Sequence, residues 1–258
     1  MSAAERVQAY ARATAARLLE PVPVPPFTAY LHALDLPHLN YAIPDGPSPD
    51  GLEEALPRLR AAFAERGRAL RIELVEEALP ALAPALAAHG LDEELRLPGL
   101  ICAADALVDA PPVPGLAVIR LAQASRAESW LAAMAVQAVA FGVDEPLAPA
   151  DAEAARARYA EDAVLLAVLD GQPVGAGVAT RPVDGVSEVA GIGVVPAAHG
   201  LGIELALVAA CARSAFRSGA GLAFLTPGDD GAAGLYARCG FAPALTIVHL
   251  ADEAAAAT

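Results

Sequence analysis

The segment from Val194 to Leu207 holds the residues with the clearest chemical potential. Its sequence, VVPAAHGLGIELAL, joins a predicted strand end to a glycine loop and the start of a predicted helix. Glycines let a backbone approach a ligand closely, and the free N–H groups and dipole of a helix start favour an anion such as a pyrophosphate. The residue types therefore indicate a phosphate site, although an ordinary tight strand-to-helix turn explains a two-glycine loop equally well.

Two ordered motifs resemble signatures of the GCN5-related N-acetyltransferase (GNAT) superfamily. The stretch 194–204 contains V-x-P followed by H-x-x-G-x-E, where the family has V-x-P and R/Q-x-x-G-x-G/A, and LYARCGF at 235–241 matches L-Y-x-x-x-G-F. The resemblance covers residues 117–250. It implies an α/β (α+β) GNAT fold, in which a mixed, mostly antiparallel central sheet is flanked by helices and acetyl-CoA lies between splayed strands four and five.

The resemblance also implies a set of cofactor-binding residues on a strand end, the glycine loop and the first helical turn. These residues are Gly193, Val194, Val195, His199, Gly200, Leu201, Gly202, Ile203 and Glu204. Backbone groups around Gly193 and Val194 are expected to meet the pantetheine arm. No metal is expected, because the sequence has no cluster of metal-ligating residue types.

Two residues depart from the family pattern. His199 replaces Arg or Gln, which keeps a donor for a phosphate oxygen but weakens the charge-assisted bond. Glu204 replaces Gly or Ala, and a carboxylate facing a pyrophosphate is electrostatically unfavourable. We expect Glu204 to point outward instead, because a negative side chain in the first helical turn interacts favourably with the helix dipole.

The catalytic residues inferred from the resemblance are Glu188 and Tyr236. An attacking amine must lose a proton and the departing thiolate benefits from a nearby acid. Glu188 lies six residues before Val194, the spacing of the general-base glutamate in the histone-acetylating branch; an edge-of-sheet carboxylate that only solvates its strand is an equally good interpretation. Tyr236 matches the tyrosine that many members place near the CoA sulfur, with core packing as the alternative. Cys239 is interpreted as buried filler.

These residues predict an acyltransferase, an N-acetyltransferase that moves an acetyl group from acetyl-CoA to a primary amine by direct attack. The acceptor, a small-molecule or peptide amine, is not identified by the sequence. The alternative is a non-catalytic acyl-CoA-binding or interaction module with a decayed GNAT site, which His199 and Glu204 favour. A change of Glu204 to glycine that greatly tightened CoA binding would indicate decay.

Elements of suitable pattern surround these motifs. The expected order after residue 116 is a strand, two helices, a three-strand meander, a helix, a strand, a helix and a strand: 116–122, 125–141, 149–160, 163–195, 202–218, 222–226, a helix around 234–240, and 244–250. Turn sequences DGQ and VDG separate the meander strands, since Asp-Gly pairs suit tight hairpins.

The first half of the chain resembles the order of a GNAT repeat without its phosphate loop, as in tandem GNAT proteins with a degenerate N-terminal repeat. We predict an N-terminal helix and proline-rich connection at 1–26, a degenerate GNAT-like domain at 27–108, a stiff linker at 109–116, the catalytic domain at 117–250 and a frayed tail at 251–258.

Composition excludes several other classes of function. The chain of 258 residues has a formal net charge of −14 and no lysine, so it offers no basic surface for nucleic acid. No apolar run is long enough to predict a membrane span, and the N-terminus lacks a secretory pattern, so a cytoplasmic location is expected. Three scattered cysteines indicate reduced thiols, and His32, His38, His89 and His249 are interpreted as surface or structural residues. The oligomeric state stays open.

Overall fold

The computed structural model describes residues 1–32, 39–46, 48, 50–143, 146–228 and 230–252. The chain forms two compact units, Met1–Gly99 together with Ala244–Thr258, and Leu100–Pro243. This division differs from the predicted one. It falls before the 109–116 segment, and it places the end of the predicted 117–250 domain in the first unit.

The first unit contains a three-strand meander followed by a helix, a parallel strand and a second helix. Its elements after the N-terminal helix are β1 (Glu20–Val24), β2 (Phe27–Leu31), β3 (Tyr41–Pro44), α2 (Leu52–Ala64), β4 (Arg71–Val75), α3 (Leu82–Ala88) and β5 (Leu91–Ala103). β1, β2 and β3 pair antiparallel in sequence, and β4 pairs parallel to β3. This order is the one that the resemblance predicts for a GNAT-like repeat.

The proline-rich segment after the first helix is a strand, so its prediction as a connection is wrong. β1 carries Pro21 and Pro23, lies at the edge of the sheet and, among the described strands, pairs only with β2. Proline has no N–H group to donate to a neighbouring strand. Because the two prolines are two residues apart, their nitrogens face the same side of β1, the side away from β2, where no donor is needed. The prolines also protect this edge from pairing with another chain.

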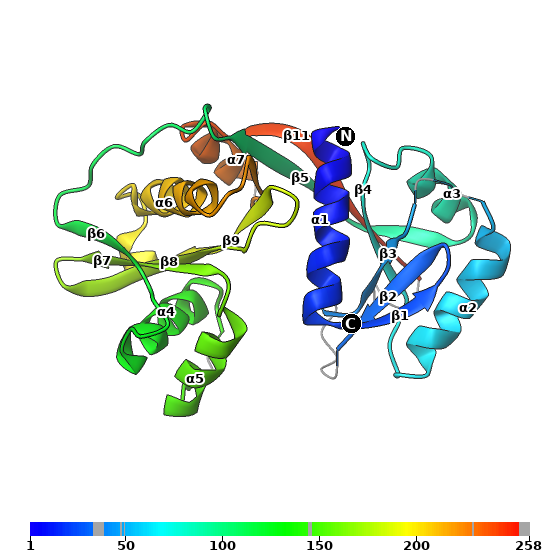
Figure 1. The fold of residues 1–258 in the computed structure, drawn as a ribbon, viewed down its shortest axis with the longest axis horizontal. Helices are drawn as coiled ribbons and strands as arrows, with labels where there is room; N and C mark the ends of the chain where they lie inside the picture. The colour runs from blue at the N-terminus through cyan, green and yellow to red at the C-terminus, as the bar shows by residue number, and fades with distance from the viewer. Residues whose placement is uncertain (33–38, 47, 49, 144–145, 229, 253–258) are drawn as a thin grey trace. The chain divides into compact units, whose positions relative to one another are not determined.

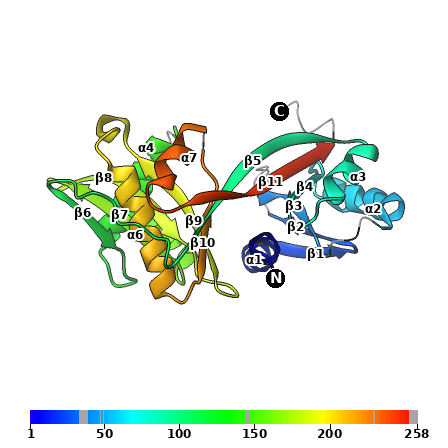
Figure 2. The same cartoon turned by 90° about the horizontal axis from the view of Figure 1, so that it is seen from above.

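Helices cover both faces of the first unit's sheet (Figure 2). Helix α1 (Ala3–Leu18) begins with a capping box between Ser2 and Glu5, and its Ala15 packs with Tyr30 and Ile43. Helices α2 and α3 pack on the other face, where they share a core with alternate residues of β2. The period-two alternation along β2 thus supplies two separate cores.

The second unit confirms the predicted order of elements as far as the last helix. It contains β6 (Leu116–Arg120), α4 (Ala127–Ala140), α5 (Pro149–Arg158), β7 (Ala163–Leu169), β8 (Gln172–Ala179), β9 (Val186–Val194), α6 (Ile203–Arg217), β10 (Leu222–Leu225) and α7 (Asp230–Ala237). Both predicted turns of the meander use positive φ angles at Asp-Gly, 48° and 82° at Asp170 and Gly171 and 47° and 72° at Asp184 and Gly185. Such angles belong to type I′ hairpins, which match the twist of the strands.

The sheet of the second unit lies between two helical layers (Figure 1). Helix α6 packs on one face of β7, β8 and β9. Helix α4 packs on the opposite face, and α5 packs against α4. The core under α6 includes alanines, Leu207 and Cys211, and the core under α4 is built around Trp130. These layers fix α6 relative to the end of β9, where the glycine loop lies.

Each unit is completed by a strand from the other half of the sequence. In the first unit, the last strand β11 (Ala242–Asp252) pairs antiparallel with β4. In the second unit, the end of β5, Leu100–Ala103, pairs antiparallel with β10. The first unit therefore combines two separate stretches of sequence, and the division between the units falls within β5 and β11 rather than at the linker.

The end of β11 corrects the predicted frayed tail. Ala251 and Asp252 still belong to the strand, and Arg60 of α2 donates to the Asp252 carboxylate at 2.8 Å. Only the remaining residues of the predicted tail, 253–258, lie outside the described part of the chain.

The three cysteines are buried and unbridged, as predicted. Burial raises the pKa of Cys102 and of Cys239 to about 11 and raises that of Cys211 further, so none of the three is a reactive thiolate. No helix among the described residues has both the length and the apolar composition that crossing a membrane requires.

Gly240 of the LYARCGF motif is predicted to be essential for stability. Its φ is 90°, and a Cβ there would lie 2.0 Å from the backbone oxygen of Ala106, whereas a Cβ at Gly219, with φ of 100°, meets nothing within 4 Å. Gly219→Ala should lower the free energy of unfolding by about 1 kcal/mol from backbone strain alone, and Gly240→Ala by about 3 kcal/mol or more. Urea denaturation measures both variants, and equal losses would contradict the close approach of Ala106.

Candidate active site

Strands β9 and β10 pair only at their beginnings. Leu222, Ala223 and Phe224 pair in parallel with Val186, Ser187 and Glu188, and no described strand pairs with β9 beyond Glu188 on that side. Residues 189–194 keep β8 as their partner on the other side. The separating strands therefore leave backbone N–H and C=O groups of β9 open toward the space between them.

A bulge shapes the open part of β9. The register with β8 shifts between Ala176 and Val178, and Gly191 on β9 has a φ of 59°. The side-chain amide of Gln137 on α4 donates to the Gly191 carbonyl at 2.6 Å and fixes this irregular turn. Sequence reasoning missed Gln137, although a lone amide in the otherwise apolar C-terminal half of this helix was the available signal.

A cavity of about 310 Å³ lies where β9 and β10 separate. Three residues singled out from the sequence line it together: Glu188, Glu204 and Tyr236. Sequence reasoning did not identify three other lining residues: Phe141 after α4, and Leu225 and Thr226 at the end of β10. These residues carry no motif, and only the path of the strands brings them to the cavity.

Glu188 is the half-buried carboxylate of this cavity. Its backbone N–H donates to the hydroxyl of Thr180 at 2.8 Å, and its carbonyl accepts from the Thr180 N–H at 2.9 Å, which fixes the strand position of the side chain. Burial raises the pKa of the Glu188 carboxyl to about 7. A carboxyl with this pKa exchanges a proton readily near neutral pH, as a general base must.

The outward orientation expected for Glu204 is wrong. Its carboxylate accepts a hydrogen bond from the Tyr236 hydroxyl at 2.6 Å, and both side chains line the cavity. The helix dipole favours a carboxylate anywhere in the first turn, so it does not decide the direction. The short charge-assisted bond to a nearly buried tyrosine does decide it.

The glycine loop has the backbone geometry of an anion site. Gly200 and Gly202 have φ angles of 76° and 82°, which residues with a Cβ rarely adopt. Gly202 is the N-cap of α6, and no side chain caps the first turn. The N–H groups at this helix start are therefore available to an anion, and Gly200 and Leu201 are exposed. Ile203 is buried and anchors the turn.

His199 does not face the loop as a simple phosphate donor. Its Nε2 donates to the carbonyl of Val194 at 2.8 Å, across the turn that joins β9 to α6. The carbonyl of Val194, which was expected to meet the pantetheine arm, thus already accepts one hydrogen bond. Val195 donates its N–H to Val174 of β8. Gly193 is buried, and a Cβ there would lie 2.9 Å from Ala140 of α4.

The described histidines outside the glycine loop have local contacts. Among the described residues, no three His, Cys, Asp or Glu side chains are placed to hold a metal ion. The His32 N–H donates to the buried Asn40, His89 caps the end of α3, and His249 lies 3.8 Å from Glu73, where burial lowers its pKa. His38 lies outside the described residues.

Comparisons with known proteins agree with this geometry. The sequence model of the acetyltransferase (GNAT) family matches residues 130–241. A solved structure described as a GCN5-related N-acetyltransferase from Kribbella flavida is 33% identical with a TM-score of 0.84, over 98% of this chain and 96% of that one. A comparison with curated protein sequences finds no match.

More distant solved structures share the fold. A tandem GNAT protein from the clavulanic acid biosynthesis pathway is 15% identical with a TM-score of 0.63, over 97% of this chain and 95% of that one. A GCN5-related N-acetyltransferase from Sphaerobacter thermophilus is 18% identical with a TM-score of 0.59, over 88% and 76%. At such identities the likeness concerns the fold alone.

The raised pKa of Glu188 predicts a pH-dependent stability. Between its ordinary pKa of 4.5 and about 7 the folded protein keeps a proton that the unfolded chain has lost, so rising pH through this window lowers stability. As the pH rises through this window, the unfolding free energy of the wild type should fall by on the order of 2 kcal/mol relative to that of Glu188→Gln. Urea denaturation from pH 4 to 8 measures this difference, and a flat profile would contradict the buried carboxyl.

Proposed function

Because the chain belongs to the GCN5-related N-acetyltransferase (GNAT) family, we propose that its second unit transfers an acetyl group from acetyl-CoA to a primary amine. The observation that carries this proposal is the cavity between the separating strands β9 and β10, with Glu188 in its wall and the glycine loop of α6 nearby. An ordinary strand-to-helix turn does not need a cavity beside it, and a carboxylate that only solvates the sheet edge does not need to line one.

The proposed substrate site runs from the glycine loop to the cavity. The uncapped N–H groups of α6 suit the pyrophosphate, with Gly200 and Gly202 allowing close approach. The open edge of β9 around Gly193 suits the amide groups of the pantetheine arm. Acetyl-CoA supplies the thioester, and the cavity is where its acetyl end would meet the amine.

In the proposed reaction Glu188 is the general base. A protonated amine gives one proton to the Glu188 carboxylate, and its nitrogen lone pair attacks the thioester carbonyl carbon. The C–S bond then breaks, and the thiolate of CoA leaves and takes up the second proton that the nitrogen loses as it becomes an amide. A pKa of about 7 leaves a substantial share of Glu188 deprotonated at neutral pH, so the base is ready without a further partner.

Besides its proposed role as the acid that protonates the thiolate, Tyr236 has a second role. Its hydroxyl proton is directed at Glu204, so it must change acceptor before it can protonate the thiolate. The same bond holds the Glu204 carboxylate beside Tyr236, in the cavity wall, and restrains it from turning toward the phosphate loop at the start of its own helix. We regard Tyr236 as the residue that makes a glutamate tolerable at position 204.

The acceptor is proposed to be a cationic small-molecule or peptide amine. Glu188 and Glu204 place two carboxyl groups around one cavity, and the chain carries a formal net charge of −14. Both features attract a cation and repel an anionic acceptor. The exposed Phe141 at the cavity adds an apolar contact for the body of the amine.

The first unit is proposed to be a degenerate GNAT-like repeat, and 109–116 a linker between the sequence repeats. Helix α2 occupies the place of α6 in the order of elements and also begins after a glycine with positive φ, Gly51 at 74°. Its first turn carries Glu53 and Glu54, which oppose a pyrophosphate. We therefore assign one acetyl-CoA site per chain, in the second unit.

The alternative function is a non-catalytic acyl-CoA-binding module. Glu204 in the cavity wall and His199 turned to Val194 both favour it, because neither adds to cofactor binding. Acetyl-CoA binding without release of CoA by any amine would support this alternative.

The experiment that tests the proposal measures CoA thiol release with a panel of primary amines and peptide N-termini. Glu188→Gln should lower kcat/KM by about 100-fold or more while acetyl-CoA binding stays unchanged, because only proton transfer is lost. Glu161→Gln, an exposed carboxylate outside the cavity, is the matched control and should act like the wild type. Equal rates for Glu188→Gln and the wild type would rule out Glu188 as the base.

A further inference from the structure

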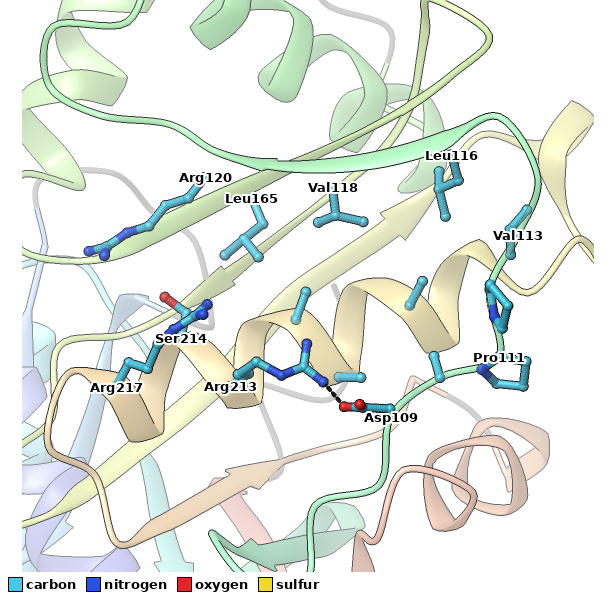
Figure 3. A pocket seen from close by; sticks show the side chains of 15 residues that line it. Asp109, Pro111, Val113, Leu116, Val118, Arg120, Leu165, Arg213, Ser214 and Arg217 are labelled. Carbon is cyan, nitrogen blue, oxygen red and sulfur yellow. Dashed lines mark hydrogen bonds and ion pairs between the residues drawn. The ribbon is translucent and has the colours of Figure 1, made fainter.

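A second cavity, of about 460 Å³, lies along α6 away from the candidate active site (Figure 3). All its lining residues belong to the second unit, and none of them lines the first cavity. Its floor is the alanine face of α6, Ala206, Ala209 and Ala210, whose small side chains leave the space open. The segment from Asp109 to Val113 and strand β6 form its walls, and we call this space the α6 groove.

One end of the α6 groove is cationic. Arg120, Arg213 and Arg217 line it, and Figure 3 shows Arg120 and Arg217 at the same end. Arg213 donates to the carboxylate of Asp109, but neither Arg120 nor Arg217 forms an ion pair with any described residue. With Asp109 counted, three arginines and one aspartate give this groove a local charge of +2 in a chain of net −14.

A buried hydroxyl at the same end lacks a partner. Ser214 is only 2% exposed and lines the groove, and its Oγ has no hydrogen-bond partner among the described residues. Buried hydroxyl groups are nearly always hydrogen-bonded, so the unsatisfied hydroxyl of Ser214 is a candidate donor for a polar ligand that enters the groove.

The other end of the α6 groove is apolar. Pro111, Val113, Leu116 and Val118 line it, and Leu116, Val118 and Arg120 alternate along β6 so that all three face the groove. The groove therefore has an apolar region and a cationic region at its two ends, and its volume is within the range of small-molecule sites.

The α6 groove is separate from the proposed acetyl-CoA site. Arg217 lies 14 residues after Ile203, the first residue of α6, which corresponds to about 21 Å along the helix axis. Glu204, which lines the active-site cavity, does not line the groove.

We propose that the α6 groove binds an organic carboxylate with an apolar body. Arg120 and Arg217 would hold the carboxylate, Ser214 would donate to it, and the apolar end would cover its chain. The ion pair of Asp109 with Arg213 places one carboxylate beside one guanidinium of this groove. Guanidinium and carboxylate match in geometry, which favours this head group over a neutral one.

Calorimetric titration with octanoate tests the proposal. The wild type should bind octanoate more than about tenfold more tightly than acetate or octanol, because only octanoate uses both ends of the groove. Arg120→Gln combined with Arg217→Gln should weaken octanoate binding about tenfold or more, while Arg126→Gln, an exposed arginine outside the groove, should not.

A second variant separates binding from folding defects. Asp109→Asn removes the one negative charge of the groove, so it should tighten octanoate binding, a gain that a misfolded protein cannot show. Saturating acetyl-CoA should leave octanoate binding in place. The proposal is overturned if acetyl-CoA displaces octanoate, if octanol binds as well as octanoate, or if the double arginine variant binds like Arg126→Gln.

Discussion

The candidate site depends on one constraint, the separation of two parallel strands after three paired residues. β10 pairs with β9 only as far as Glu188. Beyond that residue β9 has a bulge at Gly191, whose carbonyl accepts a hydrogen bond from Gln137. A continuous sheet at this place would satisfy every backbone group and leave no room. The separation instead exposes a strand edge beside a helix start, and it places the half-buried Glu188 at the junction.

The bond between Glu204 and Tyr236 is the second determinant of the site. A glutamate in the first turn of α6 is compatible with the helix dipole but conflicts with an anion bound at the same helix start. The hydroxyl of Tyr236 fixes the carboxylate in the cavity wall. The same carboxylate that opposes a pyrophosphate can attract a cationic amine, so in the proposed function Glu204 affects both cofactor binding and the choice of acceptor.

The sequence predicts the helices and strands of both units better than it predicts which strands pair and which side chains contact each other. Hairpin turns, glycine loop and motif spacing are local, so period and turn chemistry are enough to place them. The strand formed by Pro21 and Pro23 and the exchange of the last strands depend on which sheet edges are free, which no local pattern contains. The direction of Glu204 depends on a residue 32 positions away.

The most direct measurement is a calorimetric titration of acetyl-CoA into the wild type, Tyr236→Phe, Glu204→Ala and the double variant. We expect the wild type to bind acetyl-CoA at micromolar concentrations, Tyr236→Phe to bind about tenfold more weakly because Glu204 is released, and the Glu204→Ala background to abolish that loss. Failure of the wild type to bind well above micromolar concentrations would contradict the acetyl-CoA site. An unchanged loss in the Glu204→Ala background would contradict the restraint by Tyr236.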